Sequence, residues 1–265
     1  MNDHAGPTCR AQDTRYVACM SQIEPASAQL ESFPDDGIAV VTGATGGIGA
    51  AFVRALESSG RFSRVVAAGR SNAYQLDIRD PDAVTAFAGN LAESLAGAPI
   101  RLVIDATGFL HDETRMPEKS WRDINAQDMA HSYAVNAIGP ALLMQNLLPL
   151  LPREGKSAFV TLSAKVGSIG DNRIGGWYAY RASKAALNQI VRCAAIELGR
   201  RWRESVCVAM HPGTVHTPLT QPFAKNGLNV REPDQAAAEM LAVIDALTAQ
   251  ESGGFFDYRG ERLPW

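Results

Sequence analysis

Tyr180 and Lys184 are the two residues whose types and spacing most clearly point to chemistry. They lie four positions apart at the start of an apolar stretch with helical periodicity, so on a helix their side chains share one face. An ammonium group a few ångströms from a phenol favours the phenolate and lowers the pKa of the tyrosine, which could then exchange a proton with a substrate oxygen. The same spacing also arises by chance, so a packed tyrosine beside a solvent-exposed lysine is the alternative unless other segments supply partners.

A glycine-rich segment follows a predicted strand at 37–42 and precedes a predicted helix. The strand is a short β-branched run, which is typical of a buried parallel strand. Glycines at such a strand–helix turn, here Gly43, Gly46, Gly47 and Gly49, let backbone N–H groups approach a pyrophosphate at the positive end of the helix. A plain tight turn is the alternative, but the context favours a dinucleotide site.

The second predicted strand, 65–68, ends at Gly69 and Arg70. An acidic residue there would bind the ribose 2′-hydroxyl of NAD, whereas a guanidinium suits the 2′-phosphate of NADP. The sequence therefore favours NADP and leaves NAD open. A third strand is predicted at 74–78, which begins too soon after Arg70 for a crossover helix. Either a bare loop makes this connection or the strand boundaries lie elsewhere.

Asn136 and Ser163 are two further candidates for a site. A long helix is predicted over 127–151, and Pro140 within it lacks an N–H, so the carbonyl of Asn136 loses its helical partner and the helix kinks. That carbonyl could bind a water, although a tolerated proline kink explains the pattern equally well. Ser163 ends the predicted strand 157–163, at the edge where open α/β sheets bind ligands. Alone, it could also be a capping or turn serine.

Predicted strands and helices alternate along most of the chain. Further strands are predicted at 101–108, 206–210 and 254–257, and further helices begin near Pro81 and Pro233. This alternation is typical of an α/β fold, here a Rossmann-like, doubly wound, seven-stranded parallel sheet with helices on both faces.

Residues 37–265 show no break in composition and are expected to form a single catalytic domain, preceded by a flexible N-terminal extension at 1–36. The net charge of −3 gives no reason to expect nucleic acid, and no apolar run is long enough to span a membrane. The four cysteines and five histidines show no metal-ligand spacing, so no metal is expected. Reduced thiols and a cytoplasmic location are the expectation.

Together these motifs resemble the short-chain dehydrogenase/reductase family, from about residue 37 to the end of the sequence. The glycine segment resembles the family's cofactor loop, and Asn136, Ser163, Tyr180 and Lys184 match its catalytic tetrad. The segment 105–108, Asp-Ala-Thr-Gly, departs from the family's usual Asn-Asn-Ala-Gly. Within the family, Ser-Ile-Gly-Asp-Asn-Arg before the tyrosine is similar to C-factor-like members.

The resemblance implies a role for each member of the tetrad. Tyr180 would be the general acid or base, and Lys184 would lower its pKa and hold the nicotinamide ribose. Ser163 would bind the substrate oxygen, and Asn136 would hold a water behind the lysine. The implied cofactor-binding residues are Gly43, Thr45, Gly47, Ile48, Gly49, Arg70, Asp77, Ile78, Ala106, Gly108, Tyr180, Lys184, Pro212, Gly213, Val215 and Thr217.

The expected activity is NADP-dependent reduction of a small-molecule carbonyl, or the reverse oxidation, by a homodimer or homotetramer. The alternative is a nucleotide-binding signalling or regulatory protein of the C-factor type that needs no turnover. A nucleotide-sugar epimerase is a further alternative, but it would be expected to have a larger C-terminal substrate-binding region. The loop 217–231, with Leu219, Phe223 and Leu228, predicts only a partly apolar cover for the substrate. Residues 164–177 are expected to form an extra loop beside the pocket.

Overall fold

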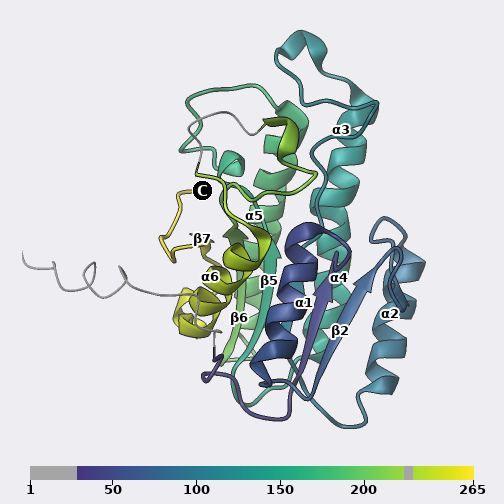
Figure 1. Cartoon of the computed structure of the whole chain (residues 1–265), viewed down its shortest axis with the longest axis vertical. Coiled ribbons are helices and arrows are strands. Elements are labelled where there is room, and N and C mark those ends of the chain that lie inside the picture. The colour runs from purple at the N-terminus through teal and green to yellow at the C-terminus, as the bar shows by residue number, and fades with distance from the viewer. Residues whose placement is uncertain (1–28, 224–228) are drawn as a thin grey trace, which may run out of the picture.

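Seven parallel strands form one sheet in the order β3-β2-β1-β4-β5-β6-β7 in the computed structural model, which describes residues 29–223 and 229–265 (Figure 1). The strands are β1 (Ile38–Thr42), β2 (Arg64–Gly69), β3 (Tyr74–Gln75), β4 (Ile100–Asp105), β5 (Ser157–Leu162), β6 (Ser205–His211) and β7 (Phe255–Asp257). The strand order reverses between β1 and β4, where doubly wound sheets bind ligands beyond the carboxyl ends of their strands. The predicted fold is confirmed.

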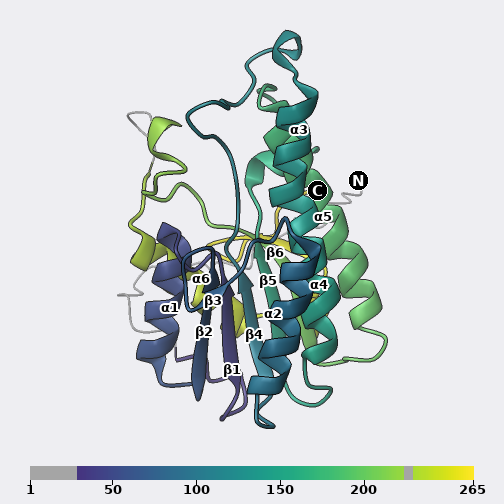
Figure 2. The same cartoon turned by 90° about the vertical axis from the view of Figure 1, so that its right-hand side faces the viewer.

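Helices cover both faces of the sheet (Figure 2). The α1 (Gly47–Ser59) and α6 (Pro233–Ala246) helices share one hydrophobic core with one face of the sheet. The α2 (Pro81–Ser94), α4 (Gly139–Leu147) and α5 (Tyr178–Leu198) helices share a second core with the other face. Because β1 and β5 are buried along their whole length, apolar and β-branched residues occupy both faces of these strands.

The β3 strand pairs with β2 through Ala68 and Tyr74 and is reached by a bare loop. It is shorter than the predicted segment 74–78, because it ends at Gln75. Asp77 and Ile78 therefore lie beyond the strand, at its carboxyl end.

The long helix predicted over 127–151 is divided into several segments, with a π-helical turn between its two α-helices. The α3 helix (Ala126–Tyr133) leads into a π-helical turn (Ala134–Ile138), then α4, and a 3₁₀ turn (Leu148–Leu150) follows. In the π-helical turn the N–H of Gly139 donates to the carbonyl of Ala134. A π-helical turn, which ends two residues before Pro140, thus lies where the kink was predicted, and such turns are frequent at functional sites.

Residues 29–36 belong to the folded part of the chain, although the sequence placed them in the extension. Leu30 and Phe33 are fully buried in the core shared by α1 and α6. Lys156 Nζ lies 4.6 Å from the centre of the Phe33 ring. Residues 1–28 lie outside the described residues.

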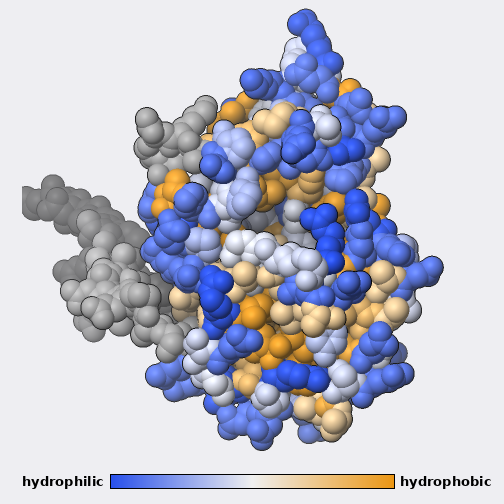
Figure 3. Space-filling view, turned by 45° about the vertical axis from the view of Figure 1, so that its right-hand side comes forward, coloured by the Kyte–Doolittle hydropathy of each residue, from blue (hydrophilic) through white to orange (hydrophobic). Residues whose placement is uncertain are grey.

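No helix in the described part of the chain has the length and apolarity needed to cross a membrane. Residues 29–223 and 229–265 also contain no cluster of three or more His, Cys, Asp or Glu that could hold a metal ion. The face shown in Figure 3 carries hydrophilic side chains interspersed with smaller hydrophobic patches.

Candidate active site

The α5 helix carries Tyr180 in its first turn and Lys184 one turn later, and Lys184 reaches the carboxyl end of β5. Lys184 is only 3% exposed, and its Nζ donates to the carbonyl of Leu162 at 2.8 Å. This bond joins the helix to the end of the strand, directly before Ser163. No hydrogen bond to the Tyr180 hydroxyl forms among the described residues, so this hydroxyl is free to meet a substrate oxygen.

Burial affects both ionisable groups of this pair. It lowers the pKa of Lys184 to about 8, against the opposing attraction of Asp105, and it raises the pKa of Tyr180 above its ordinary value. The sequence predicted the opposite direction for the pKa of Tyr180. The direction differs because burial of the phenol penalises its charged form, the phenolate. The tyrosine is protonated at neutral pH, as an ordinary tyrosine also is, and can donate a proton.

Asn136 is fully buried and joins the end of β4 to α5. Its Oδ1 accepts from the N–H of Phe109 at 2.8 Å, and its Nδ2 donates to the Phe109 carbonyl at 2.8 Å and to Ser183 Oγ at 3.1 Å. A Cβ added to Gly108 would lie 3.8 Å from Asn136 Oδ1 and 3.9 Å from Lys184 Nζ. The structure thus brings Gly108, Asn136 and Lys184 together. The water expected at the Asn136 carbonyl stays a prediction.

Ser163 lies just beyond β5 and is 3% exposed. Its N–H donates to the carbonyl of Met210 in β6, and its Oγ donates to Asn188 Oδ1 at 2.6 Å. Asn188 was missed by the sequence analysis. The only signal for it was a further four-residue step along α5 after Lys184.

The glycine loop packs tightly against the end of β4. Gly43 has a φ of +70°, and a Cβ there would lie 2.8 Å from the carbonyl carbon of Ala106. A Cβ on Gly49 would lie 2.2 Å from the carbonyl oxygen of Gly43. Gly46 caps α1 without any side-chain hydrogen bond, and the first turn contains no acidic residue. The N-terminal N–H groups of α1, including that of Ile48, are thus suited to bind an anion such as a pyrophosphate.

The predicted adenosine side lies around the end of β2. Thr45 packs near Gly69, because a Cβ on this glycine would lie 3.5 Å from Thr45 Oγ1. Arg70 is exposed. Ile78 is buried, and a Cβ on Gly139 of α4 would meet its side chain, so only the Ile78 backbone is suited to contact a ligand.

Asp77 is paired with Arg79, which the sequence analysis missed. Arg79 Nε donates to Asp77 Oδ1 at 2.9 Å. This side-chain bond lowers the pKa of Asp77 to about 2, and the charge of Arg70 acts in the same direction. Arg70 and Arg79 therefore both place positive charge near Asp77.

Asp105 accounts for the difference between Asp-Ala-Thr-Gly at 105–108 and the Asn-Asn-Ala-Gly that is usual in the family. Its buried carboxylate accepts from the hydroxyls of Thr42 at 2.9 Å, Thr107 at 2.6 Å and Thr161 at 2.7 Å, and from the Thr107 N–H at 3.1 Å. These residues come from β1, β5 and the end of β4, so the carboxylate holds the three central strands together where Ala106 and Gly108 emerge.

The segment 212–217 follows β6 and lies beside the glycine loop. Arg231 Nη2 donates to the carbonyl of Pro212 at 2.6 Å, and Arg231 pairs with Val215 in an isolated bridge. Gly213 has a φ of +72° and packs on the same arginine. A Cβ on Gly47 would lie 2.9 Å from Thr217 Cγ2, so the two segments meet.

The predicted extra loop, 164–177, ends at Trp177, which has a φ of +52°. The Trp177 N–H donates to the Glu118 carbonyl at 2.6 Å, and the Glu118 carboxylate accepts from the Ala179 N–H at 3.2 Å. The centre of the Trp177 ring lies 6.2 Å from that of Tyr180 and 5.0 Å from that of Phe223. The Trp177 ring thus packs edge-on against both Tyr180 and Phe223. Leu228 lies outside the described residues.

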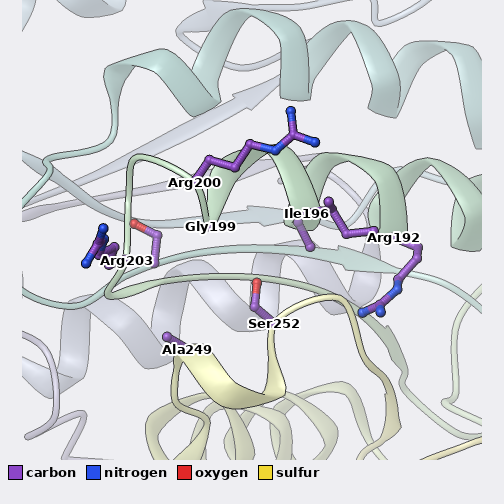
Figure 4. A pocket seen from close by; sticks show the side chains of 9 residues that line it. Arg192, Ile196, Gly199, Arg200, Arg203, Ala249 and Ser252 are labelled. Carbon is purple, nitrogen blue, oxygen red and sulfur yellow. The ribbon is translucent and has the colours of Figure 1, made fainter.

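A hollow of about 470 Å³ lies at the opposite end of α5 from Tyr180 (Figure 4). Arg192, Arg200 and Arg203 line it, but their guanidinium groups point in different directions. This hollow is separate from the tetrad and presents no convergent polar groups.

Comparisons with known proteins agree with this geometry. The model of the family described as Enoyl-(Acyl carrier protein) reductase matches residues 40–251. "C-signal" of Myxococcus xanthus is 39% identical over 143 residues, which cover 54% of this chain and 82% of that protein. A 1-hydroxy-2-glutathionyl-2-methyl-3-butene dehydrogenase of Rhodococcus is 32% identical over 206 residues, covering 76% of this chain and 83% of that protein.

The solved structure of an NADPH-bound carbonyl reductase from chicken fatty liver has a TM-score of 0.77 to this chain at 27% identity. The match covers 88% of this chain and all of that structure. The family model, the relatives and the parallel seven-stranded sheet all support one assignment. The chain belongs to the short-chain dehydrogenase/reductase family of oxidoreductases.

Proposed function

We propose that this protein is an NADPH-dependent reductase of small-molecule carbonyl compounds that also catalyses the reverse alcohol oxidation. One observation carries the proposal: Lys184, bonded to the end of β5, lies beside Ser163, Asn136 and the Tyr180 turn of α5. These residues meet at the sheet edge next to the glycine loop. The similarity to an NADPH-bound carbonyl reductase supports the choice of cofactor.

The residues around the glycine loop fit a dinucleotide. Free N–H groups at the start of α1 suit the pyrophosphate, and Gly43 already places the loop against Ala106. Arg70, with Arg79 near it, suits a 2′-phosphate. NADPH, when bound, supplies the hydride.

In the reduction, Tyr180 donates its phenol proton to the carbonyl oxygen. The phenol is protonated at neutral pH, as its ordinary pKa already ensures and burial reinforces, so it has a proton to donate. The Lys184 ammonium stabilises the tyrosinate that remains and can donate to a ribose hydroxyl. Ser163 hydrogen-bonds the same substrate oxygen and holds it for the transfer. The carbonyl carbon gains a hydride and its oxygen gains a proton, which gives the alcohol.

A nucleotide-binding regulator that needs no turnover is the second candidate, and the similarity to "C-signal" is the observation behind it. The complete tetrad does not favour this candidate, because binding alone needs no acid beside a buried lysine.

The proposal is tested by measuring NADPH and NADH binding by fluorescence, and then the oxidation of bound NADPH by a panel of aldehydes, ketones and quinones. Tyr180→Phe should keep NADPH binding and lose turnover by at least about 100-fold. Tyr178→Phe, on the same helical turn, is the matched control and should remain active. No turnover with any carbonyl compound would refute the reductase. A biological effect that survives Tyr180→Phe would favour the regulator.

We also propose a homodimer formed through α4 and α5 in the cytoplasm. Ile138, next to α4, and Ile196, on α5, are 53% and 49% exposed, which suits a subunit contact. Cys193 and Cys207 are free thiols, as a reducing compartment allows. Sedimentation of the wild type and of Ile196→Glu tests the contact, and the variant should be monomeric. We propose residues 37–265 as the catalytic domain, with 29–36 packed onto it.

A further inference from the structure

Asn188 is a buried polar residue that the proposed mechanism does not use. It lies on α5, one turn after Lys184 and two turns after Tyr180, so the three side chains share one face of the helix. Asn188 is only 3% exposed. Its neighbours Leu187 and Val191 are fully buried and fill the core. If packing were the only requirement at position 188, an apolar residue would therefore be sufficient.

The hydrogen bonding of Asn188 is directed at a single partner. Its Oδ1 accepts from Ser163 Oγ at 2.6 Å. Its Nδ2 is buried and has no hydrogen-bond partner within residues 29–223 and 229–265. A buried donor without a partner lowers stability, and an apolar side chain would avoid that loss. The hydrogen bond to Ser163 is thus the interaction that accounts for an asparagine at this position.

We infer that Asn188 is a positioning residue that fixes the orientation of the Ser163 hydroxyl in the active site. This inference rests on the proposed carbonyl reduction, in which Ser163 holds the substrate oxygen. A serine hydroxyl carries one hydrogen and rotates unless a neighbour holds it. The Ser163 backbone is already fixed by its bond to Met210, and the Asn188 amide fixes the side chain and its hydroxyl.

An amide suits this task because it offers both a donor and an acceptor. In the free protein the serine hydrogen points to Asn188 Oδ1. When this hydrogen turns toward a substrate oxygen, Ser163 Oγ can instead accept from an N–H of the same amide. A leucine has nearly the same shape as asparagine and offers neither group. In a variant with leucine at position 188, the Ser163 hydroxyl would be free to rotate, and a smaller fraction of bound substrate would be correctly oriented for reaction.

The test compares Asn188→Leu with the wild type in NADPH-dependent carbonyl reduction, with Gln189→Leu as the matched control on the exposed side of α5. We expect Asn188→Leu to lower kcat about tenfold and to leave the KM for NADPH unchanged. Gln189→Leu should be as active as the wild type. Melting temperatures and circular dichroism identify folded variants. If Asn188→Leu does not fold, Asn188→Ala takes its place.

The second arm repeats Asn188→Leu in a Ser163→Ala background, with single-turnover measurements at high enzyme concentration to follow slow reactions. A residue that acts through the serine should have no further effect once the serine hydroxyl is gone. An equal loss in both backgrounds would show a general structural effect and overturn the inference, as would an Asn188→Leu variant with wild-type kcat. A wild type without carbonyl reductase activity would instead refute the proposed function itself.

Discussion

Replacing Lys184 with methionine should abolish carbonyl reduction and at the same time raise the melting temperature of the protein. The reason is the depressed pKa of Lys184, which burial lowers from 10.5 to about 8. This value already includes the attraction of Asp105. At neutral pH the buried ammonium therefore destabilises the folded state by about 3 kcal/mol relative to an uncharged side chain.

The substitution also removes the hydrogen bond from the charged ammonium to the Leu162 carbonyl, which is worth about 2 kcal/mol. The net gain is about 1 kcal/mol, or about 2–4 °C in melting temperature for a domain of this size. The penalty is complete below the folded pKa of about 8 and disappears above the unfolded pKa, because the lysine is then neutral in both states. The advantage of the variant should therefore shrink as the pH rises from 8 to 10.5.

Thermal unfolding of the wild type and Lys184→Met at several pH values from 7 to 10 measures this difference. Lys165→Met is the matched control, because Lys165 is exposed and its Nζ lies 3.6 Å from Asp171, so the control should change little. Turnover with NADPH and a carbonyl substrate is measured alongside. A lower melting temperature for Lys184→Met at pH 7, or an advantage that stays constant with pH, would refute the electrostatic reasoning.

Three further changes follow from the geometry of the site. Asp105→Asn removes a charge that raises the pKa of Lys184, so the alkaline limb of the pH–rate profile should move to lower pH, and an unmoved or raised limb would contradict this. Gly43→Ala places a Cβ 2.8 Å from the Ala106 backbone at a φ of +70°, and urea unfolding should show a loss of at least about 2 kcal/mol together with weaker NADPH binding. Glu118→Ala removes the carboxylate that caps α5 and should cost about 1–2 kcal/mol in urea unfolding, whereas the exposed Glu113→Ala should cost little.

The sequence was sufficient for the parts of the fold that depend on local patterns. Runs of β-branched residues, glycines at a strand–helix turn and the spacing of Tyr180 and Lys184 are all features of short segments. They predicted the parallel sheet and the elements that carry the candidate site. The conflict at 74–78 also had its solution in the sequence, since a bare loop was one of the two predicted outcomes.

Features that depend on contacts between distant segments were not predictable in the same way. The direction of the pKa shift of Tyr180 follows from how deeply α5 is packed, which no local pattern reports. The bond between Ser163 and Asn188 joins residues 25 positions apart. Phe33 is fully buried in the core that α1 and α6 share, and this burial depends on surfaces that form only when the chain has folded.

Glu118 also has a consequence for engineering this protein. The residue belongs to the loop after β4, but it holds the Trp177 N–H and the first turn of α5 from a distance of about sixty positions in the sequence. Transplanting the segment 164–177 alone from a relative, in order to change the substrate range, would disturb these hydrogen bonds to Glu118. The two loops should be exchanged together, because the carboxylate that binds the first turn of α5 comes from position 118 and not from the transplanted segment. A chimera with both loops should keep Tyr180 in register, whereas one with a single loop should lose activity before it gains a new substrate.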